Sequence, residues 1–324
     1  MNGFDVVTIG SATKDIFLFN KQANLKQGIN SHFLEVPLDR KVEINKVSEF
    51  TGGSATNAAA TFSNLGKKVG VISKVGGDSN ADFILEDLRK RTISDELVVR
   101  SEGETPFSVV IVSNVGKAVI FVYRGIEKTL KYDEIKDDFS AKWMYLGPLP
   151  VEDISMIEKI LKKHKDKGTK FAMNPGSSFL SLGIKKTENI LSDIDIISMN
   201  QDEARKFVGL NNDTKNLLEL AKRVKTAAII TKGKDGSMVA DKKFIYNSNA
   251  MPAKQINYVG AGDAFFSGFI NAVIDEKDIE EAINLASYNS ASVVEKYGAK
   301  TGLVSSYPAQ RVVRISKIKY SNLS

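Results

Sequence analysis

The sequence predicts an α/β protein in three layers, with a mostly parallel β-sheet covered by helices on both faces and a small second β-sheet beside it. From residue 143 to residue 231, short apolar runs alternate with amphipathic stretches of about 10–15 residues, as in strands joined by crossover helices. Residues 16–50 and 106–124 break that rhythm with short apolar patches between polar turns. The length suits one large domain over residues 1–324 with such an appendage, since no repeat, low-complexity segment or linker divides the chain.

Composition argues against several classes of function. Hydrophobic residues make up 42% of the chain and charged residues 26%, as in an ordinary globular protein. The chain has no cysteine and only two histidines, His32 and His164, which argues against disulfides, thiol catalysis and metal sites built from cysteine or histidine. The net charge of +6 comes from scattered lysines and arginines, which favours anionic small molecules over nucleic acid.

Targeting signals are also missing from the pattern. The N-terminal residues lack the basic and then apolar order of a leader, and no apolar run reaches about 18 residues. We therefore expect a cytoplasmic protein with no membrane contact.

The first expected element is a buried strand at residues 5–10, a β-branched run that ends in glycine. Asp15 follows the carboxyl end of that strand, the edge on which open α/β sheets bind ligands. A lone aspartate after a strand is also a common turn or cap residue, so both interpretations stay open. The apolar patches of residues 16–50 are expected to form hairpin strands outside the main sheet.

A glycine pair then opens a helix of small residues. Gly52 and Gly53 leave the backbone bare for a ligand, and Asn57, one turn into the helix, has an amide that both donates and accepts hydrogen bonds. These three residues are candidates for substrate binding, although tight helix packing alone would explain the small residues around them.

The following segments return to the main sheet and then to the small one. Residues 69–73 predict a strand, which an amphipathic helix follows. Residues 106–112 and 118–123 are β-rich runs joined by a hairpin signal. We expect them to join the earlier patches as a lid over the ends of the main strands. Arg124 comes next, either as a clamp for an anionic or polyhydroxyl substrate or as a solvated charge.

The second half of the chain alternates strands and helices. The expected strands are residues 143–146, 170–174, 194–198 and 227–231, with helices at residues 152–167, 201–208, 214–225 and 278–295 and a hairpin at residues 237–246. Two polar motifs follow strand ends in this half. Asn200 and Glu203, one helical turn apart, suit one hydrated Mg²⁺, with a helix cap as the alternative. Thr231 and Gly233 offer a hydroxyl and bare backbone to nucleotide phosphates, in the absence of a Walker A string.

The string Gly260-Ala261-Gly262-Asp263 opens an apolar stretch to residue 274, which predicts a buried helix. The glycines let successive amides point at one spot, where the positive end of the helix dipole stabilises phosphate. A carboxylate beside phosphate is unfavourable unless it takes a proton, as a base that activates a hydroxyl does. The alternative is that Asp263 caps the helix.

Taken in order, these motifs resemble the ribokinase-like, or PfkB, carbohydrate kinase family over residues 5–305, most specifically in Gly-Ala-Gly-Asp-Ala-Phe followed by Ser-Gly-Phe. The resemblance implies that ATP and Mg²⁺ are used to phosphorylate a hydroxyl group of a small molecule. It implies that Asp263 is the base and that the three residues before it form the anion hole. The other implied roles are substrate binding by Asp15, Gly53 and Asn57, organisation of Mg²⁺ and its waters by Asn200 and Glu203, and ATP binding by Thr231, Gly233 and Asn289.

One position departs from the family pattern. Members usually carry Asp-Thr-x before the Gly-Ala-Gly-Asp string, and that aspartate resembles part of a monovalent-cation site. Here Asn257-Tyr258-Val259 takes its place, so the negative charge is missing. We expect K⁺ activation to be weak or absent.

The identity of the acceptor stays open. We expect a sugar or sugar-like alcohol, with a nucleoside as the alternative because Phe17, Phe19 and Phe107 near the lid offer rings on which a base stacks. A non-catalytic sugar-binding regulator on the same fold is a further possibility. Apolar lid strands that need cover suggest a homodimer formed through the lid.

Overall fold

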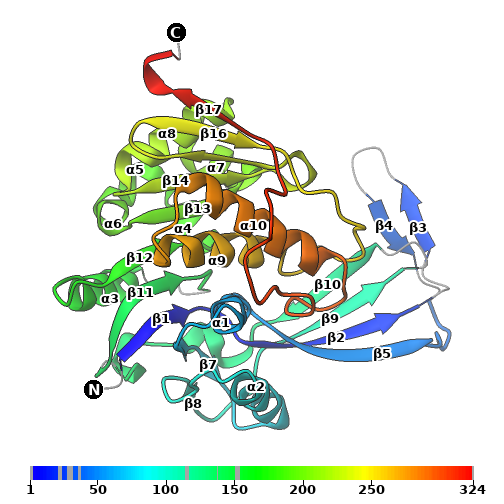
Figure 1. Ribbon diagram of the computed structural model, residues 1–324. Coiled ribbons are helices and arrows are strands. Elements are labelled where there is room, and N and C mark those ends of the chain that lie inside the picture. The colour runs from blue at the N-terminus through cyan, green and yellow to red at the C-terminus, as the bar shows by residue number, and fades with distance from the viewer. Residues whose placement is uncertain are drawn as a thin grey trace.

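A large mixed β-sheet lies at the centre of the protein. The computed structural model describes residues 3–20, 24–27, 32–35, 38–113, 117–136, 138–149 and 154–322. Within these ranges the sheet has nine strands in the order β17-β16-β15-β14-β13-β12-β11-β1-β6 (Figure 1). The strands are β1 (Gly3–Ile9), β6 (Val69–Ile72), β11 (Ser140–Leu146), β12 (Lys170–Met173), β13 (Ile196–Asn200), β14 (Ala227–Thr231), β15 (Ser237–Ala240), β16 (Phe244–Ser248) and β17 (Ile315–Lys319). Strands β6 to β14 of this order pair in parallel, and β15, β16 and β17 are added antiparallel.

Helices cover both faces of the sheet, which is why the parallel strands are apolar throughout rather than alternating. In β11, Met144 and Leu146 belong to one hydrophobic core, whereas Trp143 and Tyr145 belong to the other. The first core is completed by α3 (Ser155–Lys165), α4 (Ser177–Ser181), α5 (Gly183–Lys186), α6 (Glu188–Asp193), α7 (Gln201–Val208) and α8 (Asp213–Arg223). The second is completed by α1 (Ser54–Asn64), α2 (Ser79–Lys90), α9 (Ala261–Ile274) and α10 (Ile279–Val294).

A smaller four-stranded sheet extends to one side of the central sheet (Figure 1). Its order is β10-β9-β2-β5, with bounds Thr13–Phe19 for β2, Lys46–Gly52 for β5, Phe107–Val112 for β9 and Ala118–Tyr123 for β10. Phe17, Val110 and Val112 form its buried core, which Phe50 and Tyr297 cover. Short pairs β3–β4 (Asn24–Gln27, His32–Glu35) and β7–β8 (Lys74–Val75, Val99–Arg100) and the 3₁₀ turns η1 (Gly125–Thr129), η2 (Tyr132–Glu134), η3 (Gly233–Asp235) and η4 (Tyr320–Asn322) complete the described elements.

The three-layer fold with a small second sheet is confirmed, and the differences from expectation are local. The hairpin at residues 237–246 is not the edge of the main sheet, because β17 pairs with β16. Strand β17 was not expected, because its sequence, Ile-Ser-Lys-Ile-Lys, is mostly exposed and lacks the apolar density of a buried strand. Three short helices also fill residues 177–193 before β13. The hairpin connection at 114–116 and the helix start at 151–153 lie outside the described residues.

Helix length and polarity bear on membrane insertion. In the part of the chain that the structure describes, every helix is too short or too polar to cross a bilayer.

Candidate active site

Three segments that are far apart in the sequence meet near the carboxyl ends of β1 and β11. β1 runs through Gly10 into β2, and β5 ends at Gly52 and turns into α1. α9 begins at Ala261 and packs against α1 (Figure 1). This convergence brings Asp15, Asn57 and Asp263 to the edge of the sheet on which α/β proteins bind ligands.

The start of α9 forms a cradle of backbone N–H groups, residues 260–263, called the anion cradle below. Gly260 has φ 83°, in the left-handed region, and a β-carbon there would lie 2.5 Å from Cβ of Ala299. At Gly262 a β-carbon would meet no atom within 4 Å, so the cradle is open on that side. The Ala261 N–H donates to the Tyr258 carbonyl at 3.3 Å, so this predicted member of the anion hole is already used, whereas no acceptor for the N–H groups of Gly262 and Asp263 is found among the described residues. Unpaired N–H groups at the positive end of a helix suit an anion.

Asp263 lies in the first turn of α9, where Gly260 and not Asp263 is the N-cap. Asn57 donates from Nδ2 to Oδ2 of Asp263 at 2.9 Å, and the Tyr145 hydroxyl donates to Oδ1 at 3.4 Å. Burial raises the pKa of Asp263 to about 6, while the hydrogen bonds from Asn57 and Tyr145 and the charge of Lys300 oppose that rise. Such a carboxylate is ionised at neutral pH and basic enough to take a proton from a hydroxyl.

Asp15 is a buried carboxylate on β2. Its Oδ1 accepts hydrogen bonds from the hydroxyls of Ser108 (2.6 Å) and Thr13 (3.1 Å). Burial raises the pKa of Asp15 above its ordinary value, against those two hydrogen bonds and the charge of Lys300. A β-carbon at Gly52 would lie 1.9 Å from Oδ2 of Asp15, so the carboxylate rests directly on bare backbone.

Next to Asp263, α1 supplies an unused acceptor and a turn without side chains. Gly53 caps α1 with φ 93°, and a β-carbon there would lie 2.3 Å from the carbonyl oxygen of Ser11. Oδ1 of Asn57 is buried and has no hydrogen-bond partner among the described residues. A buried acceptor without a partner is costly, so it suits a hydroxyl of a bound molecule.

A cleft of about 460 Å³ opens on the other side of the anion cradle. Thr231 and Gly233 line one wall, and Ala261 and Gly262 line the end nearest Asp263. The remaining walls are largely apolar and include Met251, Pro252, Ala253, Phe265, Ala291 and Val294. A cleft with apolar walls and backbone N–H groups at one end suits a nucleotide, with its base along the walls and its phosphates at the cradle.

Asn200 and Glu203 form a capping box at the start of α7. Oδ1 of Asn200 accepts from the Glu203 N–H at 2.9 Å, and Oε2 of Glu203 accepts from the Asn200 N–H at 2.8 Å. The two residues therefore cap the helix, and one carboxylate oxygen of Glu203 is left over.

Two other predicted site residues do not line the cleft. Asn289 is fully buried, donates to Thr61 Oγ1 and the Ala264 carbonyl, and accepts from the Val304 N–H, so its amide joins α10 to α1 and α9. Its neighbours Ser287 and Ser290 line the cleft instead. Arg124 is exposed at the end of β10.

Asn257 replaces the aspartate of the family pattern and is buried. Its Oδ1 accepts from the Val259 N–H at 3.1 Å, and its Nδ2 is buried without a partner in the described part of the chain. The side chain thus presents a donor to its surroundings, and a donor repels a cation.

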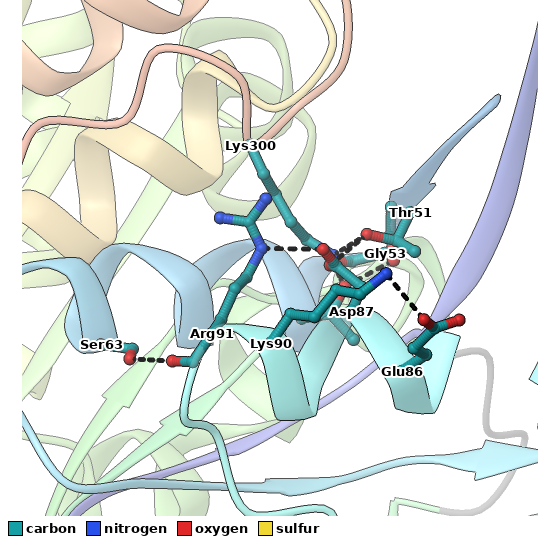
Figure 2. A network of polar contacts seen from close by, with 10 residues as sticks. Thr51, Gly53, Ser63, Glu86, Asp87, Lys90, Arg91 and Lys300 are labelled. Atoms are coloured by element: carbon teal, nitrogen blue, oxygen red, sulfur yellow. Dashed lines mark hydrogen bonds and ion pairs between the residues drawn. The ribbon is translucent and has the colours of Figure 1, made fainter. Parts of the chain in front are cut away.

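Sequence reasoning missed two residues that contact or influence Asp263. Tyr145 is fully buried in an apolar run of β11, where nothing in the local sequence distinguishes its hydroxyl. Lys300 reaches from the turn after α10 toward Thr51 and Asp87 (Figure 2). Its only sequence signal is a lysine between small residues, Gly298-Ala299-Lys300-Thr301-Gly302.

Comparisons with known proteins identify the family and fold of the chain. Residues 5–305 match the pfkB family carbohydrate kinase model. The ribokinase of Staphylococcus aureus is 27% identical over 312 residues, which cover 92% of this chain and 96% of the relative. The nucleoside kinase of Methanothermobacter thermautotrophicus is 25% identical over 264 residues, covering 80% and 83%. The solved Arabidopsis thaliana ribokinase with ribose and ATP has a TM-score of 0.75 at 19% identity, covering 94% of this chain and 96% of that chain.

Proposed function

The chain belongs to the pfkB family of carbohydrate kinases, and we propose that Asp263, the anion cradle and the adjoining cleft carry out its phosphoryl transfer. The enzyme uses ATP to phosphorylate a hydroxyl group of a sugar or sugar-like molecule. One observation carries the residue assignment. The Asp263 carboxylate meets the Asn57 amide beside unpaired N–H groups at the start of a buried helix.

Asp263 is the proposed base. The acceptor hydroxyl gives its proton to this carboxylate as its oxygen bonds to the terminal phosphorus of ATP, and the bond from that phosphorus to ADP breaks. The hydrogen bonds from Asn57 and Tyr145 fix the carboxylate and leave it able to accept the proton. With a pKa of about 6, Asp263 is mostly ionised above neutral pH, which is the form a base needs.

The anion cradle is the proposed binding site for the phosphoryl group in transit. Negative charge on that group is stabilised by N–H groups already held in place, so little reorganisation is needed during the reaction. The open space at Gly262 leaves room for the phosphate oxygens to approach the backbone.

Mg²⁺ fits this site through water rather than through a cage of side chains. The helix cap uses Oδ1 of Asn200 and Oε2 of Glu203. Oε1 of Glu203 is left to meet a water of the ion. The described residues contain no cluster of three or more histidine or acidic ligands. When bound with ATP, Mg²⁺ neutralises charge on the phosphates.

The acceptor is, in our proposal, a sugar or sugar-like alcohol bound by Asp15, Gly53 and Asn57. A buried carboxylate and a buried amide oxygen without a partner are acceptors for two or more hydroxyl groups. Phe17 is fully buried in the core of the small sheet, so it offers no ring face to a nucleobase. A nucleoside stays the second proposal, because Phe19 and Phe107 are still partly exposed. Use of ATP makes the cytoplasm the proposed location.

Asn257 supports independence from monovalent cations. Its oxygen is bound by the Val259 N–H and its nitrogen donor faces the interior, so no negative charge is offered there. Replacing K⁺ with a bulky organic cation in the assay buffer should change turnover by less than about twofold. A tenfold loss would contradict this proposal.

We propose that the small sheet is a lid and that a second copy of the chain covers its edge. All six residues of β10 are exposed, and the run Val119-Ile120-Phe121-Val122-Tyr123 offers apolar side chains and an unpaired strand edge. Light scattering should give a dimer that Phe121→Lys converts to a monomer, whereas Leu210→Lys, at another exposed apolar position, should leave it intact. A monomeric wild-type protein would contradict the proposal.

Release of ADP measured with a panel of sugars, sugar acids and nucleosides tests the function. A thermal-shift screen with a non-hydrolysable ATP analogue should first identify acceptors, because a ligand that binds the folded state raises its stability. We expect transfer to a sugar-like acceptor and none with Asp263→Asn. Binding of sugars without transfer from ATP would favour the non-catalytic regulator.

A further inference from the structure

The turn at residues 297–300, which follows α10, contacts three parts of the candidate site with three successive residues. At Gly298, φ is 87° and a β-carbon would lie 2.6 Å from the Phe50 ring of β5. Ala299 lies against Gly260 of the anion cradle. Lys300 donates from Nζ to Oγ1 of Thr51 at 2.7 Å. The turn therefore joins the lid, the cradle and the strand that leads into Gly52.

Lys300 is the charged residue of this contact, and it is buried. Its side chain is 3% exposed, and Nζ lies 3.4 Å from Oδ2 of Asp87, the same oxygen to which the Thr51 hydroxyl donates at 2.5 Å (Figure 2). Arg91 donates from Nε to the other Asp87 oxygen at 3.0 Å. Burying an ammonium group is costly, and a buried ion pair seldom repays that cost in stability. Stability alone therefore does not account for this lysine.

We propose that Lys300 is a positioning residue for the phosphoryl transfer, which fixes the substrate loop, residues 51–53, against the anion cradle and adds a positive charge near the carboxylates of Asp15 and Asp263. The proposal rests on the role of Asp263 as base. Thr51 directly precedes Gly52 and Gly53, so the hydrogen bond from Lys300 holds the loop at its first residue.

The charges around Lys300 support the electrostatic part. Asp87 lies between Arg91 and Lys300, so these three side chains together keep a positive charge. That charge opposes the rise that burial causes in the pKa of Asp263 and in the pKa of Asp15. Burial lowers the pKa of Lys300 itself to about 8, so it is still mostly charged at neutral pH. Lys300 lines a small surface hollow together with other charged residues. The charged groups that face Lys300 or this hollow are Glu86, Asp87 and Lys90 of α2, Arg91 directly after α2, Glu49 of β5, Asp15 of β2 and Asp263 of α9.

Lys74 provides a matched control. Its side chain is 6% exposed, its Nζ lies 2.6 Å from Oε1 of Glu134, and it donates to the Thr129 carbonyl at 3.3 Å. It is thus a buried lysine with one carboxylate partner, like Lys300, but it contacts neither the cradle nor the substrate loop. A role in folding alone predicts the same behaviour for both lysines.

The test compares Lys300→Met, Lys300→Gln and Lys300→Arg with Lys74→Met in steady-state assays across pH. We expect Lys300→Met and Lys300→Gln to lower kcat about 10- to 100-fold, raise the KM of the acceptor and leave the KM of ATP within about twofold. The acid limb of kcat/KM should move up by about 0.5–1 pH unit, because the charge that favours ionised Asp263 is gone. Lys300→Arg should keep the limb, and Lys74→Met should lower only the melting temperature.

The absence of cysteine from the chain allows a chemical rescue. Lys300→Cys, alkylated with 2-bromoethylamine in denaturant and then refolded, regains an ammonium group at that position, whereas the wild-type protein has no thiol to react. Alkylation should restore kcat and the acid limb. Identical kinetics before and after alkylation would overturn the proposal, as would an unmoved acid limb in Lys300→Gln, the variant that keeps a hydrogen-bond donor for Thr51.

Asp263→Asn in the same assay separates the two proposals. Wild-type turnover in Asp263→Asn would remove the base and with it the proposed function. An inactive Asp263→Asn together with Lys300 variants that behave like Lys74→Met would overturn the role of Lys300 alone.

Discussion

The acceptor side and the nucleotide side of the candidate site are built in different ways. On the acceptor side, the carboxylates of Asp15 and Asp263 are held by side chains from other elements, among them Ser108 and Asn57. On the nucleotide side, a cleft of about 460 Å³ has apolar walls and a rim of backbone at Gly233 and the anion cradle. The acceptor side is thus defined by the positions of polar side chains, and the nucleotide side by the shape of an apolar cleft. Changes on the acceptor side should therefore alter chemistry and pH dependence, and changes on the nucleotide side should alter ATP binding.

Asp263→Asn should produce the largest effect, because it removes the proposed base. We expect kcat to fall by about 10²–10⁴-fold with little change in the KM of ATP. A rapid coupled assay of ADP release measures both. Turnover within tenfold of wild type would mean that the acceptor side does not depend on this carboxylate.

The same substitution should stabilise the fold. Burial raises the pKa of Asp263 from 3.8 to about 6, so its contribution to stability is full below about pH 4 and is lost as the pH rises through 6. At pH 7–8 the ionised carboxylate is therefore unfavourable, by up to about 3 kcal/mol. Asp263→Asn removes that cost, and its melting temperature should exceed that of wild type at pH 8 but not at pH 4. A lower melting temperature at pH 8 would indicate a structural role.

Two glycines of the cradle should separate binding from folding. Gly262→Ala meets no atom and should fold normally, but its methyl group occupies the open side of the cradle, so kcat/KM for ATP should fall by about 10²-fold. Gly260→Ala requires a left-handed backbone and clashes with Ala299, so it should lose about 1–3 kcal/mol of stability. Melting curves and kinetics of both variants check the pair. If both variants lost the same kcat/KM for ATP and had the same stability, the geometry described for the cradle would be contradicted.

Asp15→Asn should weaken the acceptor and spare the nucleotide. Hydrogen bonds to a charged group contribute about 1.5–3 kcal/mol, so kcat/KM for the acceptor should fall about 10- to 100-fold. The KM of ATP should not change. Saturation kinetics with each substrate in turn measures the two constants, and a parallel loss in both would make Asp15 a residue of the fold.

Thr231→Val is the matching change on the nucleotide side and should have the smallest effect. One neutral hydrogen bond is worth about 1 kcal/mol, so the KM of ATP should rise about fivefold while the KM of the acceptor stays constant. Titration with each substrate tests this. An effect confined to the acceptor would reverse the assignment of the two sides.

The contrast between the two sides also explains what the sequence predicted. The cradle and the Thr231–Gly233 turn are local, so consecutive residues were enough to propose them. The large sheet followed from the alternation of strands and helices for the same reason. The contact between Asn57 and Asp263 joins residues 206 positions apart. The resemblance to a family assigned both residues to one site but did not predict that they touch.

The parts that sequence reasoning missed depend on tertiary packing. Tyr145 has the sequence context of an ordinary core residue, and only the approach of α9 gives its hydroxyl a partner. Lys300 lies in no motif, and its partners come from β5 and α2. Asn289 has a side chain suited to a ligand, yet the packing of α10 directs it to Thr61 and Ala264 instead. Strand β17 is an exposed edge with no apolar run to mark it.

The pH dependence of kcat/KM for the acceptor tests the role of Asp263 most directly, because it reports the ionisation of the free enzyme. We predict that the wild-type value falls tenfold per pH unit below a pKa of about 6, and that the residual activity of Asp263→Asn shows no such limb. The same acid limb in both proteins would contradict the account, because the proton would then belong to another group.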